Sequence, residues 1–471
     1  MRIVDWVREV REGATDPLRL FKECIEKIRR EDPGYNAFIT IDAREPEAKV
    51  RSEWKLPLVP VAVKDNIVTM GIRTTCASRI LENYIPSYDA TVVERLKKEG
   101  AVIIGKTNMD EFAMGSLGTT SAFGPSRNPV NPELSPGGSS SGSAVAVASG
   151  MAPLALGSDT GGSLRLPAAW TGIYTIKPTY GLVSRYGLIS YADSLEQIGP
   201  MASNASDLAY LYSVIAGYDE RDSTTLPVGE LSKVFEKVAL EEPEPGMLEG
   251  LRIGVVKEVI EHSQADEGVI NAFWRVLKKL ESNGAVIEEC SLPLASRAPQ
   301  VYYVIAFAEA SSNLARYDGV RYGPKVVSFE GKSWLEAYSE NRSLFGWEVK
   351  RRILLGSFIL SKGYYDMYYS RALKARMLIR KQVDELLRNY NVLAFPGSPV
   401  PPLPLDYDIT DLSKLNAVDA PLVIPNLTGY PALTMPVGTH NGLPLSIQFM
   451  AGRLQDAFLL RLSKAVEALG W

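Results

Sequence analysis

Hydrophobic residues near the start of the chain recur with the period of an α-helix. Four of them share one helical face: Leu18, Phe21, Ile25 and Ile28. Thr15 is a suitable N-cap, and Asp16 and Pro17 suit a first turn. Pro33 and Gly34 should end the element, because proline lacks the N–H that a continuing helix needs. The pattern therefore predicts one amphipathic helix that stops before residue 33.

Strand and helix patterns then alternate along the chain. Short apolar runs predict strands at residues 58–64, 101–105, 153–158, 250–256 and 285–292. Helical spacing predicts helices at residues 89–98, 139–150, 266–282 and 456–469. Residues 107–110 have the form of a capping box that opens another helix. This alternation indicates an α/β architecture in which helices pack on a sheet.

The later part of the chain changes character several times. Residues 218–249 are rich in charge and proline and predict a surface connection. After this segment the pattern allows either a second α/β lobe or a return to the first sheet. Residues 300–390 are mainly helical and aromatic, and residues 391–450 have strand and loop character with many prolines.

Composition narrows the possible function classes. With 46% apolar and 23% charged residues, the chain has enough apolar side chains to fold. A net charge of -4 gives no broad basic field for gripping nucleic acid. The three cysteines lack paired spacing, which favours a reducing compartment. The N-terminal residues are charged and no long apolar run follows, so we expect a cytoplasmic protein without a targeting or membrane-spanning segment.

Three kinds of site are disfavoured by the residue types. His262 and His440 are the only histidines, so we expect neither a Ser-His-Asp triad nor a metal site in this chain. Residues 100–107 match the phosphate-binding pattern G-x-x-x-x-G-K-[ST]. Their middle residues are Ala-Val-Ile-Ile, which predict a buried strand that ends near Lys106 rather than an open loop around phosphate.

Two serines lie in turns suited to nucleophilic chemistry. Ser163 follows Asp159-Thr160-Gly161-Gly162, and consecutive glycines let backbone N–H groups point one way, as an oxyanion hole requires. Ser139 follows Pro136-Gly137-Gly138, before a predicted helix. From residue types alone, helix caps are the alternative interpretation of both serines.

With histidine scarce, the candidate general base is a lysine. Lys64 ends the apolar run 58–64 and is followed by Asp65 and Asn66. Burial disfavours the ammonium form and would leave a neutral amine that can accept a proton. The alternative is a lysine that extends from a sheet edge into solvent.

Three motifs together make the chain resemble the amidase signature family. They are residues 64–66 (KDN), 137–143 (GGSSSGS) and 157–165 (GSDTGGSLR), with Ser139 lying 75 residues after Lys64 and 24 before Ser163. Ser141 stands where many members have glycine. The resemblance implies a large mixed β-sheet covered by helices on both faces, with a helical excursion in the C-terminal half. It also implies a single domain over residues 1–471 with a signature core at residues 58–200.

The same resemblance implies roles for the residues of these motifs. Ser163 would be the nucleophile, Lys64 the base, and Ser139, after a cis peptide bond, the bridge between them. The backbone N–H groups of Thr160, Gly161, Gly162 and Ser163 would hold the oxyanion, and an acyl-enzyme would form on the nucleophile.

Further segments resemble one branch of that family, the glutaminase subunits of tRNA-dependent amidotransferases. They are residues 109–115, 302–306, 309–313, 321–323, 348–356, 363–366 and 426–431. This implies that the chain frees ammonia from glutamine for a B subunit, which uses ATP and Mg²⁺ to amidate glutamate or aspartate on mischarged tRNA. A small C subunit would brace the pair, and this chain itself would hold no cofactor.

Glutamine carries both an α-carboxylate and an α-ammonium, so its site needs opposite charges. The positions that match the branch are Arg352 for the carboxylate, Asp419 for the ammonium, and Tyr302 or Tyr303, with Tyr302 preferred. Met114 lies in a segment expected to line the same pocket. Without the resemblance, Arg352 would be interpreted as a surface charge and Asp419 as a turn or cap.

Three other functions compete with this one. A free-standing amidase of the same family would act on an aryl, indole or fatty amide and would need an apolar acyl pocket. A non-catalytic scaffold would be expected to lack Lys64, Ser139 or Ser163, and all three are present. A nucleotide-dependent enzyme would have to use residues 100–107.

Overall fold

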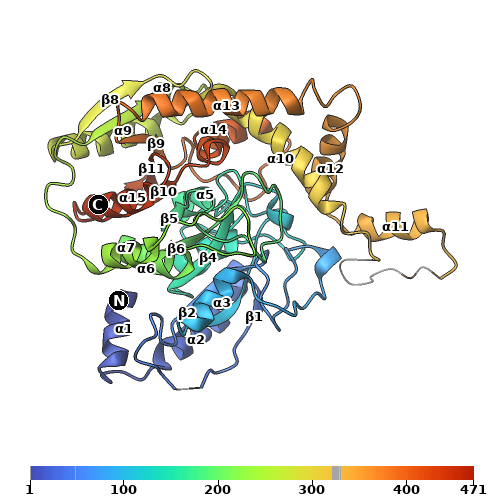
Figure 1. Ribbon diagram of the computed structural model, residues 1–471, viewed down its shortest axis with the longest axis horizontal. Helices are drawn as coiled ribbons and strands as arrows, with labels where there is room; N and C mark the ends of the chain where they lie inside the picture. Colours follow the sequence, from blue (N-terminus) through green and yellow to red (C-terminus); the bar gives the residue numbers. More distant parts are fainter. Residues whose placement is uncertain (1, 48, 321–327, 329) are drawn as a thin grey trace.

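The computed structural model describes residues 2–47, 49–320, 328 and 330–471. Its centre is an 11-stranded sheet with the order β1-β3-β2-β4-β6-β5-β10-β11-β9-β7-β8 (Figure 1). The strands are β1 (Phe38–Ile41), β2 (Pro60–Lys64), β3 (Val102–Thr107), β4 (Leu154–Asp159), β5 (Tyr174–Lys177), β6 (Gln197–Ala202), β7 (Arg252–Val256), β8 (Val286–Cys290), β9 (Val392–Pro396), β10 (Ala432–His440) and β11 (Leu443–Met450).

The sheet is mixed, as expected. Strand β2 runs parallel to β3 and β4, and β7 runs parallel to β8 and β9, whereas the other neighbours are antiparallel. Strand β9 pairs with β11 through Ile447 and Pro396, which attaches β7 and β8 to the same sheet. The chain after residue 250 therefore returns to the first sheet and forms no second lobe.

Helices cover both faces of this sheet (Figure 1). They are α1 (Ile3–Arg11), α2 (Arg19–Tyr35), α3 (Thr91–Lys98), α4 (Ser141–Ala148), α5 (Arg165–Thr171), α6 (Ala205–Ile215), α7 (Leu231–Leu240), α8 (Lys257–Ile260), α9 (Glu267–Ser282), α10 (Ala298–Leu314), α11 (Trp334–Ser343), α12 (Trp347–Ile359), α13 (Tyr369–Leu386), α14 (Leu412–Thr428) and α15 (Asp456–Glu467). Of the described helices, none is long and apolar enough to cross a membrane.

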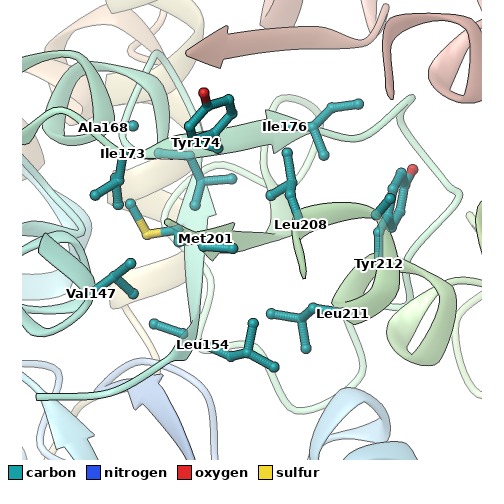
Figure 2. Packing of buried hydrophobic residues seen from close by; sticks show 14 of the residues in the cluster. Val147, Leu154, Ala168, Ile173, Tyr174, Ile176, Met201, Leu208, Leu211 and Tyr212 are labelled. Atoms are coloured by element: carbon teal, nitrogen blue, oxygen red, sulfur yellow. The ribbon is translucent and has the colours of Figure 1, made fainter. Parts of the chain in front are cut away.

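The main core joins the sheet to helices on its faces. Figure 2 shows Val147 of α4, Met201 of β6 and Leu208 of α6 among the side chains of this cluster. Residues 218–249 contribute helix α7, whose Phe235 is buried and stacks on Tyr212 with 4.3 Å between ring centroids. Helices α10, α12 and α13 form the helical excursion and pack on one another through α10 (Figure 1).

Three predictions about helix ends are wrong. Helix α2 has no cap at Thr15 and continues through Pro33 to Tyr35. It ends at Asn36, which takes a left-handed φ of 52° and so supplies the stop expected at Gly34. Residues 107–110 lead only into a single 3₁₀ turn, Glu111–Ala113, because Phe112 and Ala113 take left-handed φ values of 49° and 60°. The Thr107 hydroxyl bonds to Ser143 and caps no helix.

Helix α14 was not expected from the proline-rich pattern of residues 391–450. Its prolines, Pro421 and Pro425, lie inside the helix. Pro425 cannot donate to the Pro421 carbonyl one turn earlier, and Gln448 of β11 donates to that carbonyl at 3.0 Å instead. A side chain from a distant strand thus offsets the proline penalty, which no local pattern reveals.

Candidate active site

The two central parallel strands β2 and β4 end side by side with polar residues. Lys64 is the last residue of β2, and Ser158 and Asp159 are the last residues of β4. Lys64 Nζ donates to Ser139 Oγ at 2.7 Å, across 75 residues of sequence. The peptide bond between Gly138 and Ser139 is cis, as the family resemblance implied. The predicted base and bridging serine are therefore in direct contact.

Lys64 has no exposed surface, and its surroundings bias it toward the neutral amine. Burial lowers the pKa of Lys64 to about 7, although the nearby carboxylates of Asp110 and Asp159 act in the opposite direction. Nζ also donates to the Ser158 hydroxyl at 3.0 Å, and Asn66 donates to the same oxygen at 3.0 Å. Sequence reasoning missed this role of Ser158, because its residue type gives no signal beside the more prominent Asp159.

Ser163 is the serine that reaches the pocket. It is 8% exposed, whereas Ser139 is fully buried behind it. The backbone N–H of Ser140 donates to the Ser163 carbonyl at 3.1 Å, which ties the two serine-bearing turns together. Helix α5 starts only at Arg165, so Ser163 lies in the turn before it rather than on its first residue.

The turn that carries Ser163 is built around Asp159. Its carboxylate pairs with Arg165 through two contacts of 3.0 Å, and both side chains are fully buried. The same carboxylate accepts the backbone N–H of Gly162 at 2.8 Å and that of Leu164 at 3.1 Å. The pKa of Asp159 is lowered to about 2, because its burial is outweighed by the Arg165 guanidinium. Because the Gly162 N–H donates to Asp159, it is not available to an oxyanion, and the prediction of Gly162 as a donor is wrong. The predicted donors that remain are the N–H groups of Thr160, Gly161 and Ser163.

One polar pocket brings Ser163 together with the predicted glutamine-binding residues. Its lining includes Gly161, Ser163, Tyr302, Tyr303, Arg352 and Asp419. Arg352 is 5% exposed, and Asp419 is 3% exposed and lies inside helix α14, so the alternative interpretations of a surface charge and of a turn or cap are wrong. Asp419 comes from α14 and Arg352 from α12, which places opposite charges on two walls of the pocket.

Each charged residue of the pocket is held by a partner. Arg352 Nε donates to Glu348 at 2.6 Å, and its NH1 donates to the Tyr191 hydroxyl at 2.6 Å. Tyr303 donates to Asp419 at 2.5 Å. Burial raises the pKa of Asp419 to about 6, opposed by the Tyr303 hydrogen bond and by Arg352. Tyr191 and Glu348 were not predicted, because neither distance nor orientation relative to Arg352 can be read from the chain.

The two tyrosines occupy different positions, and the methionine does not reach the pocket. The Tyr302 ring packs so closely on Gly161 that a Cβ there would lie 2.5 Å from its Cζ atom. Tyr303 instead directs its hydroxyl to Asp419. Met114 is fully buried in an apolar cluster, while its neighbours Ala113, Gly115 and Ser116 line the pocket. The predicted segment is thus present, but the methionine side chain is not part of the lining.

The phosphate-binding pattern and His440, for which we expected no catalytic role, lie away from this pocket. Residues 102–107 form strand β3, and Lys106 is buried with its Nζ donating to the Ile67 carbonyl at 2.6 Å. His440 lines a separate pocket with Trp170. Within the described part of the chain, no cluster of three or more His, Cys, Asp or Glu side chains is placed to hold a metal ion. Residues 321–323, one of the resembling segments, lie outside the described residues.

Comparison with known proteins extends this picture. The amidase family profile matches residues 19–460 of the chain. The chain belongs to the amidase family. Its relatives in that family include the A subunit of the glutamyl-tRNA(Gln) amidotransferase of Saccharolobus solfataricus, 52% identical over 472 residues, 99% of this chain and 96% of that protein. The A subunit of the Thermus thermophilus enzyme is 46% identical over 460 residues, 97% of this chain and 95% of that protein.

Solved structures of amidase-family proteins share the fold. The A subunit of the glutamyl-tRNA(Gln) amidotransferase of Thermotoga maritima superposes with a TM-score of 0.80 at 42% identity, over 96% of this chain and 91% of that one. A peptide amidase from Stenotrophomonas maltophilia superposes with a TM-score of 0.82 at 28% identity, over 99% and 96% of the two chains. The fold is therefore common to both kinds of enzyme, while sequence identity is higher to the amidotransferase proteins.

Proposed function

We propose that this chain is the glutamine-hydrolysing subunit of a tRNA-dependent amidotransferase. The proposal rests on one observation: buried Arg352 and buried Asp419, which carry opposite charges, line the same pocket as Ser163. A free α-amino acid offers both charges that these side chains need, and an apolar amide offers neither. The 42–52% identity to proteins named as the A subunits of glutamyl-tRNA(Gln) amidotransferases supports the same assignment.

In the proposed mechanism, the neutral Lys64 amine accepts the proton of Ser139, which in turn accepts the proton of Ser163. Ser163 Oγ then attacks the side-chain carboxamide carbon of glutamine and forms a tetrahedral intermediate. The backbone N–H groups of Thr160, Gly161 and Ser163 would hold its oxyanion. The relay returns a proton to the leaving nitrogen, ammonia departs, and water hydrolyses the acyl-enzyme on Ser163 to give glutamate.

The burial of Ser163, Ser139 and Lys64 supports this order of proton transfer. Ser163 reaches the pocket, whereas Ser139 and Lys64 lie behind it and are fully enclosed. The nucleophile is therefore the only member of the proposed triad that a substrate can touch, and the base is protected from solvent. We propose that the triad lies in a signature core at residues 58–200 within one domain that covers residues 1–471.

The complex would contain two further subunits. We propose that the ammonia passes to a B subunit, which uses ATP and Mg²⁺ to amidate glutamate or aspartate on mischarged tRNA, and that a small C subunit braces the pair. The net charge of -4 fits a chain that leaves tRNA binding to its partners. The proposed site of action is the cytoplasm. A free-standing amidase is the alternative, favoured only by the likeness in fold to the peptide amidase.

Ammonia release from glutamine, asparagine and an aromatic amide distinguishes the two functions. We expect glutamine to be preferred, with faster release when the B and C subunits are co-expressed. Ser163→Ala should abolish release, whereas Ser141→Ala, a buried serine of the same motif whose hydroxyl bonds to Ser126, should retain it. Preference for the aromatic amide without any effect of the partners would instead assign the chain to the free-standing amidases.

A further inference from the structure

Helix α12 has two apolar faces, and only one of them is covered. Val349, Gly356 and Ile359 are buried against the rest of the excursion, on the same side as Arg352. On the other side Leu354 is 71% exposed and Phe358 is 46% exposed. A surface helix of a protein that acts alone normally buries its apolar stripe and exposes a polar one. The apolar side chains on the second side of α12 are therefore exposed where a helix of this composition would normally be buried.

The exposed stripe continues into the turn after the helix. The Phe358 ring centroid lies 4.4 Å from that of Tyr364 and 6.0 Å from that of Tyr368. We define the outer α12 face as Trp347, Leu354, Leu355, Phe358, Tyr364 and Tyr368, which are between 39% and 71% exposed. Ten of the 23 large apolar side chains that are exposed among the described residues fall within residues 347–378. Such a concentration marks an interaction surface rather than scattered exposure.

Positive charge accompanies this apolar surface. Six exposed Lys and Arg side chains lie within residues 347–381, against one exposed acidic side chain, Asp366, in a chain whose net charge is -4. Lys362 lies in the turn between Phe358 and Tyr364, and Arg371 lies at the start of α13, and both are exposed. A partner that covers the outer α12 face is therefore expected to carry acidic residues at the edge of an apolar centre.

We propose that the outer α12 face is the docking surface for an apolar helical face, edged with Asp and Glu, of a partner subunit in the amidotransferase complex. The proposal rests on the proposed function for the existence of that partner. Helix–helix packing suits the stripe, because Trp347, Leu354 and Phe358 recur at helical spacing. A second copy of this chain fits poorly, since it would bring two positively charged faces together. The aliphatic Leu354 and Leu355 favour a protein over nucleic acid, whose bases stack on aromatic rings.

One helix, α12, connects the proposed docking face to the glutamine pocket. The inner side of α12 carries Arg352 and Glu348, which are ion-paired at 2.6 Å. The helix is seated so closely on α10 that a Cβ on Gly356 would lie 1.9 Å from the Phe307 carbonyl oxygen. A partner helix on the outer side would therefore restrain the element that holds the proposed carboxylate-binding arginine.

The test measures binding of the full chain to the purified B and C subunits of its own organism. We expect the double variant Leu354→Glu with Phe358→Glu to weaken that binding about 100-fold or more, because buried apolar anchors dominate such interfaces. Leu240→Glu, which changes a 56% exposed leucine at the end of α7, should bind like the wild type. Lys362→Glu with Arg371→Glu should slow association about 10-fold at low salt, with the difference fading as salt is added.

Ammonia release by each free chain is the control for folding, since none of these residues lines the catalytic pocket, and it should stay within about twofold of the wild type. Wild-type affinity in the double glutamate variant would overturn the docking proposal while leaving glutamine hydrolysis intact. A wild-type dimer that the double variant converts to monomer, or binding of the face to vesicles of phosphatidylglycerol, would overturn the stated occupant. Failure of the wild type to hydrolyse glutamine would instead refute the proposed function itself.

Discussion

The pH dependence of glutamine hydrolysis should report the protonation of Lys64. Burial lowers the pKa of this amine from 10.5 to about 7. At pH 7 about half of the molecules then carry the neutral base, against about 1 in 3000 for a lysine with its ordinary pKa. The base is active only when it is neutral, so activity is lost as the pH falls through about 7. Below that value kcat should decrease about tenfold for each pH unit, and above it kcat should level off.

A second group should affect only the binding of the substrate. Asp419, with a pKa raised to about 6 by burial, must be ionised to hold the glutamine ammonium. In the free enzyme kcat/KM should therefore fall more steeply than kcat below about pH 6, because two groups are then protonated. The difference between the two profiles separates the proposed base from the proposed binding carboxylate.

The assay is initial-rate ammonia release from about pH 5 to about pH 9, at saturating and at limiting glutamine. Lys64→Arg is the matched variant, because a guanidinium keeps a positive charge but stays protonated throughout this range. We expect it to be inactive at every pH. A flat kcat profile for the wild type between pH 5 and pH 8, or near-normal turnover by the arginine variant, would refute the assignment of Lys64 as the base.

Two further substitutions test the pocket, and a third tests the packing of the helix that carries Arg352. Arg352→Ala should raise KM for glutamine about 10- to 100-fold, the value of a charge-assisted hydrogen bond, and an unchanged KM from steady-state kinetics would remove Arg352 from carboxylate binding. Tyr191→Phe deletes the hydroxyl that accepts from Arg352 at 2.6 Å and should raise KM about 3- to 10-fold with kcat nearly constant; a fall in kcat alone would contradict a positioning role. Gly356→Ala should lower the urea unfolding midpoint, because the clash with the Phe307 carbonyl at 1.9 Å costs more than the roughly 1 kcal/mol that alanine gains in a helix, and a raised midpoint would show that α10 and α12 can separate.

Local sequence was enough for the elements whose signals are local. The strand that ends at Lys64, the buried strand at residues 102–107 and helix α9 after the Asp266 cap all appear where their patterns predict them. The motifs around Ser139 and Ser163 also pointed to the family that the comparisons show. These features follow from apolar periodicity, capping and residue type over short windows, which a single chain carries in full.

Tertiary structure decided what depends on distant partners. The strands after residue 250 join the first sheet because β9 pairs with β11. Helix α14 tolerates its prolines because Gln448 donates to the Pro421 carbonyl, which Pro425 leaves without a partner in the helix. The lowered pKa of Lys64 requires a site closed on all sides, which a strand-end position in the sequence does not establish. The physical reason is the same in each case, since the free energy of a polar group depends on whether burial leaves it a partner, and the partner lies far away along the chain.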